Sequence, residues 1–110
     1  MKVGDIYKID FPFEQGQGSK YRPVLVFILI TENSEFIALK IMSTPRSFNR
    51  VKIDNWKEAN LSNESYVQLD NFKRVKFNKS SNYVGTLNFD DYNKIVSEFN
   101  KFHEHVTVQK

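Results

Sequence analysis

The 110-residue sequence contains no cysteine, two histidines, four glycines and three prolines. The absence of cysteine excludes a disulfide framework, a thiolate metal site and a cysteine nucleophile, and it suits a reducing compartment. No apolar run approaches membrane-spanning length, and the charged N-terminal residues lack the apolar core of a signal peptide. We therefore expect one soluble, cytoplasmic domain over residues 1–110, with no membrane association.

The charges are nearly balanced in number but not in position. The net charge is +3, and two stretches, 40–52 and 73–79, carry cations with no acid among them. These cations are Lys40, Arg46, Arg50, Lys52, Lys73, Arg74, Lys76 and Lys79. Such clusters suit a polyanionic partner, although charge alone favours a merely solvated surface.

The apolar pattern predicts several short strands followed by one helix. Period-two alternation or continuous β-branched and aromatic runs mark residues 4–11, 23–30, 36–43, 49–53, 65–72 and 83–88. The run at 23–30 is typical of a central strand covered on both faces. Gly85 suggests a bulge or a close backbone approach. We expect a mainly β fold, a small, strongly curved antiparallel sheet or barrel with the C-terminal helix packed on it.

The predicted helix begins after Asn88, a good N-cap, with Asp90 and Asp91 in the first turn. Apolar residues then recur at helical spacing on one face: Phe89, Tyr92, Ile95, Val96, Phe99 and Phe102. His103 and His105 are two residues apart, the wrong spacing for one metal on a helix. We expect them to be exposed helix-terminal residues, and we expect no metal or other cofactor.

Two places remain that can carry chemistry. Arg22 lies between the glycine-containing segment 14–20 and the strand at 23–30, where a scaffold can direct a side chain into a site. Ser43 and Thr44 end another strand just before Pro45. A guanidinium near a hydroxyl can bind a phosphodiester and stabilise charge that develops on it. The plainer alternatives are a solvent-facing arginine at a strand entry and ordinary turn residues.

The segments "GDIYKIDFPF", "EQGQGSK" and "RPVLVF", in this order and close together, resemble the MazF/PemK family of toxins from bacterial toxin–antitoxin pairs. "IMSTPRS" occupies the place of the strand end with a Thr/Ser pair in that family, and "YVGTLNFDDYNKIVSEFNKF" matches its last strand and closing helix more loosely. The resemblance implies an SH3-like barrel, a homodimer and a cognate antitoxin. It further implies a metal-independent endoribonuclease that cleaves single-stranded RNA by 2′-hydroxyl attack, leaving a 2′,3′-cyclic phosphate and a 5′-hydroxyl.

Carried onto this sequence, the resemblance makes Arg22 the catalytic arginine and assigns the catalytic hydroxyl to Ser43 or Thr44. Met42 within "IMST" leaves the choice between these two open. Flanking phosphates would be bound by Lys20, Arg46, Arg50, Lys73 and Arg74. Phe48 or Phe72 would stack on a base, although the core is the commoner place for such side chains. Residues 14–20 would form a lid.

Two other functions fit the same fold, because fold does not determine function. A CcdB-like relative would bind DNA gyrase without cleaving nucleic acid, through its C-terminal residues. A plain RNA-binding barrel would bind RNA and leave it intact. The segment 54–61, "DNWKEANL", is interpreted as a capped turn without chemistry, with Trp56 covering the barrel.

Overall fold

The computed structural model describes residues 1–13, 18–30, 34–45, 49–78 and 80–108, with 105–108 described by their backbone only. Within this part of the chain, six antiparallel strands form one sheet in the order β4-β5-β3-β2-β1-β6, and one helix follows. The elements are β1 (Asp5–Pro12), β2 (Ser19–Leu29), β3 (Glu35–Met42), β4 (Arg50–Lys52), β5 (Tyr66–Lys76), β6 (Asn82–Thr86) and α1 (Phe89–Val108).

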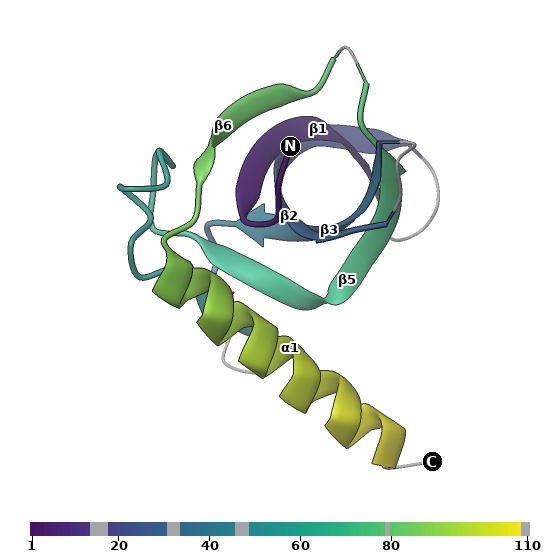
Figure 1. Cartoon of the computed structure of the whole chain (residues 1–110), viewed down its shortest axis with the longest axis vertical. Helices are drawn as coiled ribbons and strands as arrows, with labels where there is room; N and C mark the ends of the chain where they lie inside the picture. Colours follow the sequence, from purple (N-terminus) through teal and green to yellow (C-terminus); the bar gives the residue numbers. More distant parts are fainter. Residues whose placement is uncertain (14–17, 31–33, 46–48, 79, 109–110) are drawn as a thin grey trace.

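The sheet curls strongly (Figure 1). The strands β1, β2 and β3 wind around in a ring, β5 and β6 pass outside it, and α1 runs along the outer side next to β5. The predicted mainly β fold, a small SH3-like curved antiparallel barrel with a C-terminal helix, is confirmed. None of the described helical residues forms a segment long and apolar enough to cross a membrane.

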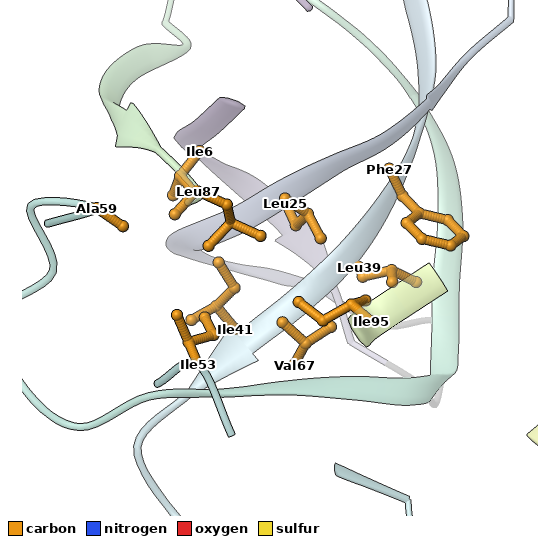
Figure 2. Close-up of a cluster of buried hydrophobic side chains, with 10 residues drawn as sticks. All are labelled: Ile6, Leu25, Phe27, Leu39, Ile41, Ile53, Ala59, Val67, Leu87 and Ile95. Carbon is orange, nitrogen blue, oxygen red and sulfur yellow. The ribbon is translucent and has the colours of Figure 1, made fainter. Parts of the chain in front are cut away.

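Two apolar clusters hold the sheet, one on each face. The first core contains Ile6, Leu25, Phe27, Leu39, Ile41, Ile53, Ala59, Val67, Leu87 and Ile95 (Figure 2). The second core contains Tyr7, Ile9, Phe11, Val24, Val26, Phe36 and Ala38. Neighbours such as Ile6 and Tyr7 belong to different cores because side chains alternate between the faces of a strand.

Strand β2 lies in the middle of the sheet, as predicted, but its two ends differ from the prediction. It begins at Ser19, so Arg22 lies inside the strand rather than at its entry. Residues 24–27 are buried between the two cores, whereas Ile28 and Leu29 are 46% and 44% exposed. The pairing of β2 with β3 shifts register between Val26 and Ile28, and beyond this shift the strand leaves both cores.

The helix prediction is confirmed at its start and wrong at Phe89. Asn88 caps α1, since its Oδ1 accepts a hydrogen bond from the backbone N–H of Asp90 at 2.8 Å. Phe89 does not join the apolar face and is 75% exposed. Leu87 already fills the first core where the chain enters the helix, so the ring of Phe89 remains outside.

His103 is not the exposed residue that we predicted. It is half-buried, its ring lies 5.4 Å from that of Phe72 and 4.2 Å from that of Phe99, and its Nε2 is 3.1 Å from the carbonyl oxygen of Leu69. The helix lies across β5, and this contact turns a polar helix-terminal residue into a packing residue. The side chain of His105 lies outside the described residues.

Candidate functional site

An open cleft of about 850 Å³ is lined by residues of β1, β2, β3 and β6 and by residues of the segment 60–65. Its lining comprises Lys8, Lys20, Tyr21, Arg22, Pro23, Ile41, Met42, Ser43, Thr44, Asn60, Leu61, Ser62, Asn63, Ser65, Asn82, Tyr83 and Val84. The cleft therefore contains Arg22, Lys20, Ser43 and Thr44 together, although Arg22 and Ser43 are 21 positions apart in the sequence.

The cleft is positively charged. Its described lining contains the cations Lys8, Lys20 and Arg22 and no acidic residue. None of these cations forms a salt bridge with another residue in the described ranges. Charges of the same sign that line a cleft add to one electrostatic potential, so these cations make the cleft suitable for an anion.

Arg22 is the most buried of these three cations. It lies within β2 opposite the buried Ile9, and it is itself half-buried. Burial lowers the pKa of the Arg22 guanidinium, because removal from water disfavours its charged form. No hydrogen bond links this guanidinium to any other residue that the structure describes. An anion such as a phosphate would supply the missing acceptors.

Ser43 and Thr44 come directly after β3, which ends at Met42. Both are exposed and line the cleft. The backbone carbonyl of Thr44 accepts a hydrogen bond from Arg50 Nη1, so β4 holds the chain where it leaves β3. Arg50 is not among the described lining residues of the cleft, although it contacts Thr44, which is.

The remaining predicted RNA-binding residues lie elsewhere. Lys73 and Arg74 belong to β5 and are not among the described lining residues of the cleft. Arg74 instead forms a 2.6 Å ion pair with Glu35. Phe72 is 43% exposed and packs with Phe99 and His103 rather than in the cleft. Arg46, Phe48 and residues 14–17 of the predicted lid lie outside the described residues.

Two contributions to the cleft escaped sequence reasoning. Lys8 of β1 lies opposite Pro23 of β2 and is exposed. Its polar position in the alternating pattern of β1 could have indicated a solvent-facing cation next to the strand of Arg22. The segment 60–65 forms one wall, although its first residues belong to the stretch interpreted as a turn without chemistry. The contact of Ala59 and Asn60 with β6 holds the beginning of the segment beside the cleft.

Asp, Glu and His residues do not gather into a metal-binding group anywhere in the described ranges. The cleft offers cations, hydroxyls and amides instead. This set of groups can bind phosphate oxygens and can form hydrogen bonds with the edges of bases.

The sequence matches none of the curated proteins. Residues 2–103 match the family described as PemK-like, MazF-like toxin of type II toxin-antitoxin system. The matched range includes every described strand, the residues of the cleft and most of α1. The chain belongs to the PemK-like, MazF-like toxins of type II toxin–antitoxin systems.

Proposed function

We propose that this toxin is a metal-independent endoribonuclease that cleaves single-stranded RNA at particular sequences. The observation that carries the proposal is the half-buried guanidinium of Arg22, which has no hydrogen-bond partner among the described residues, in a cleft lined by Lys8 and Lys20 and by no described acid. RNA supplies phosphates for the cations and bases for the uncharged polar residues of the cleft lining. A cognate antitoxin neutralises the enzyme, which acts in the cytoplasm as a homodimer.

The reaction is an internal transesterification. The 2′-hydroxyl loses its proton and attacks the adjacent phosphorus, and the bond from phosphorus to the 5′-oxygen breaks. The leaving oxygen takes up a proton, so the products are a 2′,3′-cyclic phosphate and a 5′-hydroxyl. The Arg22 guanidinium pairs with the non-bridging oxygens and stabilises the charge that grows on them. Arginine remains protonated near neutral pH, so water rather than Arg22 carries the protons.

The hydroxyl of Ser43 or Thr44 donates a further hydrogen bond to the same phosphate. Their place at the end of β3, held through the carbonyl of Thr44 by Arg50, supports this role. Ser43→Ala and Thr44→Ala, each assayed separately, decide between them. The catalytic hydroxyl is the one whose loss lowers cleavage by about a hundredfold or more, the effect typical of losing one oxyanion donor. Equal, small effects of both substitutions would remove the hydroxyl from the mechanism.

The test is incubation of the purified protein with a long single-stranded RNA in the presence of EDTA. The Arg22→Ala variant is run beside it, and Arg74→Ala serves as the matched control because Arg74 pairs with Glu35 outside the described cleft lining. We expect discrete fragments with 5′-hydroxyl ends from the wild type and from Arg74→Ala, and intact RNA with Arg22→Ala.

Three results would contradict the proposal. Full activity of Arg22→Ala would remove the arginine from the site, and inhibition by EDTA would refute metal independence. Intact RNA with folded wild-type protein would refute cleavage, and binding of DNA gyrase would then become the next assay.

A further inference from the structure

We propose that the wall formed by residues 60–65 reads the RNA sequence, and that the side-chain amide of Asn63 forms hydrogen bonds with the edge of one nucleobase. This inference rests on the proposed function in so far as RNA is the ligand of the cleft. It concerns recognition, which can be measured without cleavage.

The beginning of this wall is anchored to β6. Asn60 adopts a left-handed backbone conformation with a φ of 66°, and its Nδ2 donates a 2.8 Å hydrogen bond to the carbonyl oxygen of Val84. Just before it, the backbone of Ala59 lies against Gly85 so closely that no side chain fits at position 85. The wall therefore starts from a fixed point on the sheet.

The other end of the wall is anchored to the chain before β5. Ser65 is buried, its Oγ donates to the carbonyl oxygen of Asn63 at 2.8 Å, and its own carbonyl oxygen accepts from the backbone N–H of Ile53 at 2.9 Å. Leu61 is held by a 3.1 Å backbone hydrogen bond to the carbonyl of Trp56. With both ends held, the intervening side chains are presented on a preorganised backbone, which reduces the entropy lost on binding.

Asn63 differs from the other asparagines in the described lining. The amide of Asn60 is bonded to β6, and the amide of Asn82 donates to the hydroxyl of Tyr21. Asn63 is exposed, and its side chain makes no hydrogen bond to another residue in the described ranges. Of these three amides, the one of Asn63 is thus available to a ligand.

The chemistry of an amide selects a base over a phosphate. A carboxamide offers donors and an acceptor side by side, as the edges of bases do, whereas a phosphate offers acceptors only. The cations Lys8, Lys20 and Arg22 already provide for the phosphates. RNA whose phosphates lie on these cations would direct splayed bases toward the wall of residues 60–65, since proteins typically recognise single-stranded RNA through unstacked bases. The members of this wall that line the cleft are uncharged, whereas Glu64 is outside the described lining and forms a 3.4 Å ion pair with Lys52.

The experiment measures binding of a short random-sequence library of 2′-fluoro RNA, which lacks the attacking hydroxyl, followed by sequencing of the bound fraction. For wild type we expect enrichment of particular bases at several positions. Asn63→Ala should reduce the enrichment at one position by about 5- to 150-fold, the discrimination typical of one bidentate base contact, and leave the others. Asn93→Ala, an exposed asparagine of α1 outside the described lining, should bind as wild type does.

Asn63→Asp guards against a trivial loss of folding. It keeps the shape of the side chain, replaces the donor with an acceptor and adds a negative charge, so we expect weaker overall binding but a new preference for a base that offers a donor at that position. A misfolded protein cannot acquire a new preference.

The inference is overturned if Asn63→Ala keeps the full wild-type pattern, or if the wild type binds RNA without any base preference or does not bind it. Because the library cannot be cleaved, wild type that selects bases through Asn63 yet leaves natural RNA intact would refute the nuclease and retain the inference. If the wild type cleaves natural RNA but Asn63→Ala enriches the same bases from the library as the wild type does, the nuclease is retained and the role of Asn63 is refuted.

Discussion

Gly85 lies directly against the carbonyl oxygen of Ala59, and a Cβ atom at position 85 would stand 2.2 Å from that oxygen. The contact joins β6 to the chain segment that leads into the wall of the cleft. It explains why the position bears no side chain, and it makes one small residue of β6 important for the position of the segment that begins at Asn60.

Gly85→Ala should therefore destabilise the protein. The clashing atom belongs to the backbone and cannot rotate away, so we expect a loss of about 1–3 kcal/mol in the free energy of unfolding, the usual effect of overpacking. Chemical denaturation monitored by Trp56 fluorescence measures it. Ser97→Thr adds one methyl group at an exposed position of α1 and should change stability by less than about 0.5 kcal/mol. Equal stability of both variants would show that the contact yields without strain.

Removal of Lys8 should weaken RNA binding in a salt-dependent manner. Each phosphate contact on a single strand contributes about 0.7 to the slope of log affinity against log salt concentration. We expect Lys8→Gln, like Lys20→Gln, to reduce the slope by about that amount, as measured by titration of labelled 2′-fluoro RNA over a range of salt. Lys73→Gln is the comparison, since Lys73 lies on β5 outside the described lining. An equal reduction of the slope with Lys73→Gln would show that RNA phosphates also contact β5.

Asp91 should contribute more to stability than its neighbour Asp90. Asp91 is 2% exposed, and its Oδ2 accepts a 2.9 Å hydrogen bond from the backbone N–H of Asn55, whereas Asp90 is exposed. Asp91→Ala removes a hydrogen bond between a buried carboxyl group and the backbone, which costs about 1–3 kcal/mol. Asp90→Ala loses only a favourable interaction with the helix dipole, about 0.3–1 kcal/mol. Urea unfolding measures the free energy of unfolding of both variants. Equal losses would show that the hydrogen bond between Asp91 and Asn55 adds nothing to stability.

Tyr92 should make the protein sensitive to alkali. Its hydroxyl donates a 2.7 Å hydrogen bond to the carbonyl oxygen of Phe27, and burial raises the pKa of Tyr92 above its usual value. As the pH rises through the unfolded pKa of about 10, the unfolded chain loses this proton while the folded chain keeps it, so stability falls. Below that pH the contribution of Tyr92 is complete.

Tyr92→Phe should therefore be less stable at neutral pH by about 0.5–1.5 kcal/mol, the net worth of a hydrogen bond. It should also lose less stability than wild type between about pH 9 and 11. Part of the alkaline loss should remain, because burial raises the pKa of Tyr7 as well. Unfolding curves at several pH values measure both effects, and identical pH dependence in the two proteins would exclude Tyr92 from the transition.

Local patterns were sufficient for most of the fold. The alternation before Pro12, the run from Val24 to Phe27 and the cap at Asn88 each depend on neighbours in sequence, and the structure has them as predicted. The composition and order of segments around Arg22 also indicated the family, which the match over residues 2–103 shows.

Local patterns were insufficient where a contact between distant segments changes the environment of a residue. Helical spacing placed Phe89 on the apolar face, but Leu87 occupies the core there. The position of His103 near the end of the helix predicted an exposed side chain. In the structure its ring packs against Phe72 of β5 and Phe99 of α1.

By itself, the sequence determined the strands, the helix and the chemical character of Arg22, because periodicity, capping and charge act over a few residues. Only the tertiary structure decided which groups share the cleft. Lys8 reaches the cleft because β1 pairs with β2, where it lies opposite Pro23, and Asn63 reaches it because Ala59 and Gly85 meet. Strand register and backbone contact between distant segments depend on the packing of the whole chain, and no short stretch of sequence encodes them.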